Sequence, residues 1–129
     1  MSTDASDARV RHSSHVTHCL FVYGTLTDDD LVTTLTGQRF IKEAAVLAGY
    51  RKLVPDDGYA FIVPEADAVV EGFLLRDLDE AAVRALDQYE DEGHLYQRTP
   101  VVVRTAACQE PCMTYVGIAA ALTRSTPAG

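Results

Sequence analysis

A run of acidic residues in the second half of the chain is the first feature that could do chemistry. It places four carboxylates close together: Asp87, Glu90, Asp91 and Glu92. The usual interpretation of such a run is a solvated helix end. On a helix, however, each residue advances by about 100°, so Glu90 lies only about 40° from Leu86, the centre of the predicted apolar stripe. We therefore predict that Glu90 points inward.

The surroundings predicted for Glu90 favour its protonated form. The C-terminal end of the helix dipole and the neighbouring carboxylates all disfavour a further negative charge, so we expect the pKa of Glu90 to be raised. A carboxylate with a raised pKa suits a general base that works near neutral pH. The alternative is a purely structural carboxylate that is held by Arg98 or Tyr96.

A second candidate segment lies near the start of the chain, with the sequence FVYGTL over residues 21–26. Its bulky apolar residues predict a buried strand that ends in a turn at Gly24. Backbone N–H groups just beyond a strand end have no ladder partner, so they can face an anion or a carbonyl group. The alternative is a glycine turn with no function.

The elements that carry these two segments can be predicted from local patterns. A short helix is expected between Thr27, as its N-cap, and Gly37. A longer helix has capping-box spacing at Asp77 and Glu80 and ends before Gly93. Strands are predicted over residues 19–23, 44–54, 59–63, 69–75, 96–105 and 113–119, with turns at 55–58 and 64–67. These elements predict an α+β domain with a curved or closed mixed sheet.

Length and charge bound the class of protein. The chain has 129 residues, with 11 Lys and Arg against 19 Asp and Glu, which gives a formal net charge of −8 at pH 7. This length predicts one domain, which we place at residues 18–122 between polar tails at 1–17 and 123–129. The acidic balance argues against nucleic acid or an anionic membrane as a partner. No membrane span or secretory signal is predicted, so we expect a cytoplasmic location.

Histidine and cysteine residues near the start of the chain raise the question of a metal site. His12, His15 and His18 recur every three residues beside Cys19. No second ligand pair follows at zinc-finger spacing, so we predict no metal site. The cysteines are odd in number and are expected to be free thiols, with Cys108 and Cys112 on either side of a hairpin turn.

Several motifs occur in a fixed order along the chain. They are Phe21-Val22-Tyr23-Gly24-Thr25-Leu26, Gly49-Tyr50, Val70-Glu71-Gly72-Phe73-Leu74, Leu86-Asp87-Gln88-Tyr89-Glu90 and Tyr96-Gln97-Arg98. Over about residues 20–118 the chain thereby resembles the γ-glutamylcyclotransferase-like superfamily, in particular its AIG2-like branch. The resemblance implies a small mixed β-barrel of about six strands with flanking short helices. It also implies a cavity between the tyrosine-glycine loop and the end of the acidic helix.

The resemblance also implies an activity. Members of this family with known activity cyclise a γ-glutamyl amide, which releases 5-oxoproline and a free amine or amino acid. The implied substrate is therefore a small γ-glutamyl molecule, and no metal or organic cofactor is implied. The residues that match the family's functional positions are Glu90 as catalytic base, Tyr23, Gly24, Thr25 and Leu26 as the substrate-binding loop, and Tyr96 as a further substrate contact.

Two departures from the family pattern bear on this interpretation. Family members usually carry glycine directly after the glutamate, where this chain has Asp91, and a Tyr-Pro pair where this chain has Tyr59-Ala60. The missing glycine favours the alternative, a non-catalytic small-molecule-binding domain of the same fold.

Overall fold

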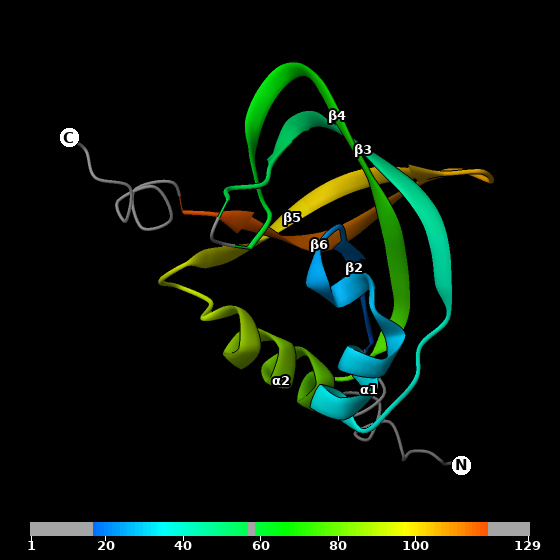
Figure 1. Cartoon of the computed structure of the whole chain (residues 1–129). Coiled ribbons are helices and arrows are strands. Elements are labelled where there is room, and N and C mark those ends of the chain that lie inside the picture. Colours follow the sequence, from blue (N-terminus) through cyan, green and yellow to red (C-terminus); the bar gives the residue numbers. More distant parts are fainter. Residues whose placement is uncertain (1–16, 57–58, 119–129) are drawn as a thin grey trace, which may run out of the picture.

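Five strands close into a mixed barrel in the order β2-β4-β3-β5-β6 (Figure 1). The computed structural model describes residues 17–56 and 59–118, so the tails predicted at 1–17 and 123–129 lie outside it, apart from residue 17. The strands are β2 (His18–Val22), β3 (Lys42–Leu53), β4 (Phe61–Leu78), β5 (Tyr96–Thr105) and β6 (Gln109–Gly117). Neighbouring strands are antiparallel, except that β2 runs parallel to β6. The predicted α+β class and mixed barrel are confirmed.

The barrel has five strands rather than about six because the strands predicted at residues 59–63 and 69–75 form one continuous strand. The turn expected at residues 64–67 lies inside β4, which runs without interruption from Phe61 to Leu78. Its ladder with β3 shifts register there: Tyr50 pairs with Pro64 and Ala48 with Val69. Gly49, between these two β3 residues, has a φ of 86°, which glycine adopts at little cost. The polar residues therefore mark an irregularity in one long strand.

A short helix follows β2. The chain makes the 3-10 turn η2 (Thr25–Thr27) and then the helix α1 (Asp29–Thr36). The N-cap of α1 is Asp28, whose side chain accepts hydrogen bonds from the N–H groups of Asp30 and Leu31, so the prediction of Thr27 was wrong. Thr27 instead donates its hydroxyl to the carbonyl of Gly24. Gly37 ends the helix in a left-handed conformation, as predicted.

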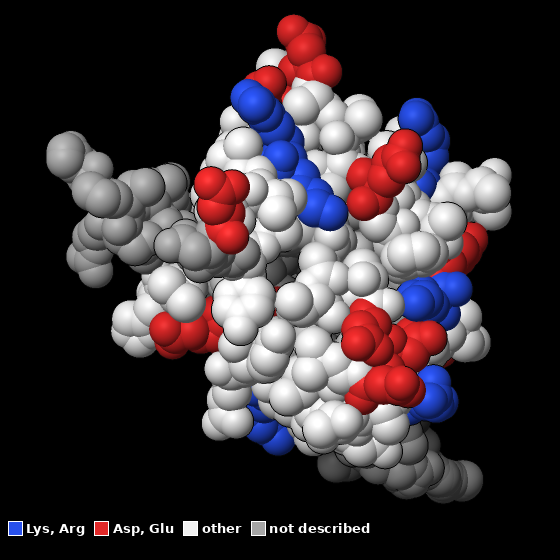
Figure 2. All heavy atoms as spheres, viewed as in Figure 1, with Lys and Arg blue, Asp and Glu red and all other residues white. Residues whose placement is uncertain are grey.

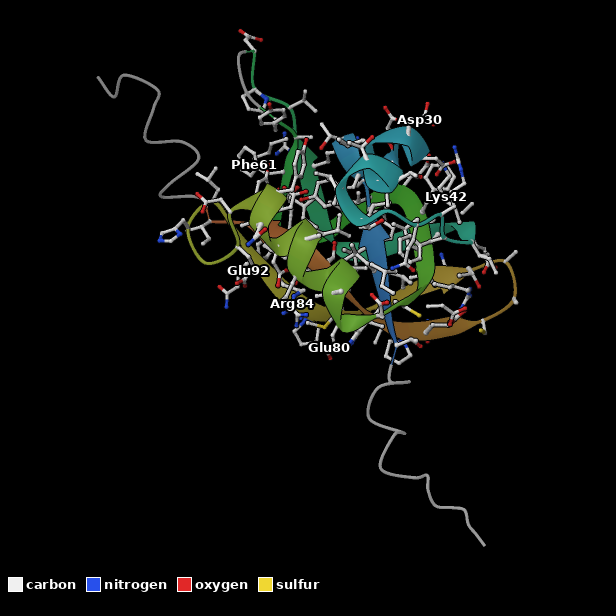
Figure 3. The ribbon with its side chains drawn as sticks, turned by 90° about the horizontal axis from the view of Figure 1, so that it is seen from below. Asp30, Lys42, Phe61, Glu80, Arg84 and Glu92 are labelled. Atoms are coloured by element: carbon white, nitrogen blue, oxygen red, sulfur yellow. The ribbon has the colours of Figure 1, made fainter. Side chains whose placement is uncertain are left out.

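The longer helix is α2 (Glu80–Glu90), and its N-cap is Asp79 rather than Asp77. The Asp79 side chain accepts a hydrogen bond from the N–H of Ala82 at 2.8 Å. Asp77 still lies in β4, which continues to Leu78, and α2 begins only at Glu80, so the side chain of Asp77 does not cap the helix. Both helices lie on the same side of the barrel (Figure 1). Figure 3 shows α2 from below, running from Glu80 toward the loop with Glu92.

The core has two parts that share the barrel wall. Inside the barrel lies a cluster that includes Phe21, Leu47, Ile62, Leu74 and Val103. A second cluster joins the barrel to the helices, with Leu20 and Val22 of β2, Val32 of α1, and Leu86 of α2 among its members. Because β2 and β4 each contribute neighbouring residues to both clusters, these two strands join the helices to the barrel.

Gly72 marks a close approach between β4 and β2. A Cβ atom at this position would lie 2.2 Å from the carbonyl oxygen of Val22, inside any allowed contact distance. Only glycine therefore lets the two strands pair where β2 ends and the candidate loop begins.

Charged residues of both signs are mixed on the face of the molecule that Figure 2 shows. On the face in Figure 2, Lys and Arg side chains lie among Asp and Glu instead of gathering into one patch. Arg76 joins three strands by binding the carboxylates of Glu43 and Glu110, at 2.7 and 2.5 Å. None of the helices among the described residues is long and apolar enough to cross a membrane.

The three cysteines are free thiols, as predicted. Cys108 is exposed in the turn between β5 and β6, but Cys112 is buried within β6, so the prediction that both flank the turn was wrong. Burial raises the pKa of the Cys112 thiol to about 12. It is therefore protonated and unreactive at neutral pH.

Candidate active site

A hollow opens where β2 ends, between the β2–α1 loop and the C-terminal end of α2. Its empty space is about 310 Å³, part of which is open to solvent. The hollow is lined by all the residues predicted for the site, namely Tyr23, Gly24, Thr25, Leu26, Glu90 and Tyr96. Phe21, Val22, Tyr59, Ala60 and Tyr115 complete its wall. The structure therefore brings the acidic helix end and the glycine loop together, although they are far apart in the sequence.

Glu90 is the last residue of α2 and is half-buried in the wall of the hollow. Burial raises the pKa of Glu90 from 4.5 to about 7. The predicted direction is thus correct, but the cause is loss of water around the carboxylate rather than the neighbouring acids or the helix dipole. Within the described part of the chain, the carboxylate has no hydrogen-bond or ion-pair partner.

The structural alternative for Glu90 was wrong. Arg98 binds Asp87 instead, with its Nε 3.0 Å from Oδ1 of that residue. Tyr96 donates its hydroxyl to the backbone carbonyl of Ala60, at 2.9 Å. Both groups that could have neutralised Glu90 are therefore engaged elsewhere, and the carboxylate is left facing the hollow.

The loop at residues 24–26 lines the same hollow and contains backbone N–H groups that have no acceptor among the described residues. In the described structure, the N–H groups of Gly24, Thr25 and Leu26 have no hydrogen-bond acceptor. The neighbouring carbonyls are occupied: Gly24 accepts from the backbone N–H of Thr27 at 3.0 Å, and Tyr23 accepts from Lys52 at 2.8 Å. The loop is thereby held in place while its N–H groups stay free, an arrangement that can bind a carboxylate or an oxyanion.

Tyrosine side chains form much of the wall. The hydroxyl of Tyr23 donates to the backbone carbonyl of Tyr115, and burial raises the pKa of Tyr23 far above its usual value. Burial also raises the pKa of Tyr96 to about 12. Both phenols are therefore neutral near pH 7, and their hydroxyls are used to fix the wall rather than to exchange protons.

Three polar contacts around the hollow could not be read from the sequence. Tyr115 donates its hydroxyl to Asp87 at 2.6 Å, and Arg98 binds the same carboxylate. Tyr89 of α2 donates to the hydroxyl oxygen of Thr25 at 3.1 Å, which joins the helix to the loop. No sequence signal would have found these contacts, because each joins elements that only the barrel brings together.

Asp91, which stands where the family usually has glycine, is the C-cap of α2. Its φ of 55° and ψ of 53° lie in the left-handed region. Glycine enters this region at little cost, and aspartate is among the few other residues that adopt it regularly. The backbone at the end of α2 therefore reaches the conformation that glycine would permit, and His94 pairs with the Asp91 side chain at 3.2 Å.

The histidine run near the start of the chain lies mostly outside the described residues, which exclude His12 and His15. His18 lies 3.0 Å from the carboxylate of Glu80 at the start of α2. Across residues 17–56 and 59–118, no group of three or more His, Cys, Asp or Glu side chains could hold a metal ion.

A comparison with protein-family models decides the family. Residues 20–127 match the model described as "Gamma-glutamyl cyclotransferase, AIG2-like". The chain belongs to this family.

Individual relatives of this AIG2-like chain are distant in sequence. It is 26% identical over 105 residues to the AIG2-like protein C of Arabidopsis thaliana. The aligned region covers 81% of this chain and 61% of the relative. The chain thus spans less than two thirds of that relative's length. A solution structure of another Arabidopsis thaliana protein matches with a TM-score of 0.73 and 25% identity, covering 82% of this chain and 72% of that one.

A solved γ-glutamyl cyclotransferase has the same fold as this chain. The TM-score is 0.67 at 16% identity, and the match covers 79% of this chain and 67% of the other. At this identity, the likeness shows the fold alone.

Proposed function

We propose that this protein converts a γ-glutamyl amide, either of an amine or of an amino acid, to 5-oxoproline and the free amine. The observation that carries the proposal is the pairing, in one hollow, of the unpartnered Glu90 carboxylate with the free N–H groups of Gly24, Thr25 and Leu26. Membership of the AIG2-like γ-glutamyl cyclotransferase family supports it.

The proposed reaction is an intramolecular acyl transfer. The α-amine of the glutamyl group attacks its own γ-carbonyl, so that one C–N bond forms the five-membered lactam and the C–N bond to the leaving amine breaks. Nucleophile and electrophile belong to one molecule, so the protein has to select a folded conformer rather than bring two reactants together. No metal or organic cofactor is needed for this chemistry.

Glu90 is the proposed general base. It first takes a proton from the substrate ammonium, which frees the lone pair of the α-amine for attack, and passes this proton to the nitrogen of the leaving amine. The second proton, which the α-nitrogen loses once the new C–N bond has formed, goes to the departing amine, which leaves as its ammonium form. A carboxylate whose pKa is about 7 accepts this proton more readily than one at 4.5, and at neutral pH much of it is still ionised.

The free N–H groups of the loop are the proposed binding site for negative charge. Three donors from Gly24, Thr25 and Leu26 can hold a substrate carboxylate, or the oxyanion that develops on the γ-carbonyl oxygen. No lysine or arginine side chain lines the hollow among the described residues, so the donors there are neutral groups, namely the backbone N–H groups and the hydroxyls of Thr25 and Tyr59.

Incubation with a panel of γ-glutamyl amines and γ-glutamyl amino acids tests the proposal. We expect at least one of them to yield equal amounts of 5-oxoproline and amine, measured by mass spectrometry. Binding of such compounds without any 5-oxoproline would favour the alternative, a non-catalytic binding domain. The sequence argument for that alternative was Asp91, whose left-handed conformation is one that glycine would also adopt.

A further inference from the structure

Asp87 has an unusual set of partners for a residue on a helix surface. Its Oδ1 accepts a hydrogen bond from the Tyr115 hydroxyl at 2.6 Å and from Nε of Arg98 at 3.0 Å. Its Oδ2 accepts a second bond from Nη2 of Arg98, at 3.2 Å. One carboxylate of α2 is therefore tied to both β5 and β6 by three charge-assisted bonds.

These bonds lie where apolar packing of α2 has ended. The buried side chains of α2 are Ala82, Val83 and Leu86, and none follows Leu86 within the helix. Beyond it, the last turn contacts the rest of the protein through polar groups: Asp87 at the barrel, and Tyr89 at the loop. The place of the last turn, and so of Glu90, depends on those contacts together with one just beyond the helix, where the backbone N–H of Arg98 donates to the Glu92 carboxylate at 3.1 Å.

We infer that Asp87 is a positioning residue for Glu90: its bonds to Tyr115 and Arg98 hold the last turn of α2 against the barrel, which keeps the Glu90 carboxylate in the hollow. Asp87 precedes Glu90 by three residues, so the two lie on neighbouring faces of the same turn. The inference rests on the proposed function only for the catalytic consequence, because the position of Glu90 can be measured without turnover.

The network continues from Asp87 into the wall of the hollow. Tyr115, which donates to Asp87, accepts the hydroxyl of Tyr23 at its backbone carbonyl. Both tyrosines line the hollow beside Glu90. Loss of the Asp87 carboxylate would therefore free Tyr115 and Arg98 together, and the helix end would be able to move toward water.

The titration midpoint of Glu90 reports whether its carboxylate is buried in the hollow. Few titratable groups among the described residues lie near this carboxylate. Tyr23 from the end of β2, Tyr96 from β5 and Tyr115 from β6 are close enough to feel its charge. On its own helix and the following loop, the charged neighbours are Asp87, Asp91 and Glu92. The three tyrosines are neutral near pH 7, so the midpoint of Glu90 depends chiefly on how much water reaches it.

The test is a carbon-13 NMR titration of the Glu90 carboxyl in the full chain, assigned with Glu90→Gln. In Asp87→Ala we expect the midpoint to fall from about 7 by at least about one pH unit, as water reaches the carboxylate. Removal of a nearby negative charge alone also lowers the titration midpoint of Glu90. Asp91→Asn is therefore the matched control: it removes an adjacent carboxylate, keeps a residue that tolerates the left-handed conformation, and touches neither β5 nor β6.

The outcomes separate the two claims. A folded Asp87→Ala protein whose midpoint moves no further than that of Asp91→Asn would overturn the inference. If Asp87→Ala does not fold, Tyr115→Phe decides, since it removes one bond to Asp87 and no charge: a lower midpoint supports the inference, and an unchanged one refutes it. Absence of 5-oxoproline from the wild-type protein would refute the proposed function and leave this titration unaffected.

Discussion

The pH dependence of stability should reveal the burial of Glu90. The pKa of this carboxyl rises from 4.5 in the unfolded chain to about 7 in the folded protein. Between these values the unfolded chain has released its proton while the folded chain still holds it, so the free energy of unfolding falls as pH rises. With partial exposure to water allowed for, this loss amounts to at most roughly 3 kcal/mol above pH 7. Below pH 4.5 it vanishes.

Replacement by glutamine removes this loss, because the amide is neutral at every pH. Glu90→Gln should therefore be more stable than the wild type at pH 8, by up to roughly 3 kcal/mol, and the two should converge as pH falls toward 4.5. Urea unfolding followed by circular dichroism at several pH values measures the difference. Glu71→Gln, at an exposed position of β4, is the control and should show little trend. A difference that does not vary with pH would refute the reasoning.

Two further substitutions test the surroundings of the hollow. Tyr89→Phe removes the bond to Thr25 that joins α2 to the loop, and we expect turnover of a γ-glutamyl amide to lose about two- to tenfold in kcat/KM with little change in melting temperature. A kcat/KM equal to that of the wild type would show that the bond from Tyr89 to Thr25 does not contribute to turnover. Gly72→Ala places a Cβ against the Val22 carbonyl and should lower the free energy of unfolding by about 1–3 kcal/mol, measured by urea unfolding. Glu71→Ala, at the neighbouring exposed position of β4, is its control, and equal losses would contradict the packing argument.

The place of Glu90 could be predicted because it depends on local periodicity. Once Leu86 is taken as the buried face of a helix, the geometry of the helix turns Glu90 inward, whatever the rest of the fold. The cause of its raised pKa could not be predicted, since burial of the carboxylate depends on the loop and strands that close around it. The free N–H groups after Gly24 were likewise predictable, because a strand that ends in a turn leaves them unpaired.

Other features depend on contacts that local patterns do not encode. The polar residues at 64–67 have the composition of a turn, yet pairing with β3 on both sides carries the strand through them. The bond between Asp87 and Tyr115 joins residues 28 positions apart and exists only because the barrel places β6 beneath α2. Asp79 and Asp77 are equally good caps by type, and the length of β4, which runs through Asp77 to Leu78, decides between them.

The pH dependence of the rate of 5-oxoproline release at substrate concentrations well below KM, where the rate reports kcat/KM, tests the general base most directly when it is measured for the wild type and Glu90→Gln. We predict that the wild-type rate rises through a midpoint near pH 7, as Glu90 loses its proton. Glu90→Gln should be slower by about 10² to 10⁴-fold, without that midpoint. A glutamine variant that turns over within a few-fold of the wild type, with the same pH profile, would contradict the assignment.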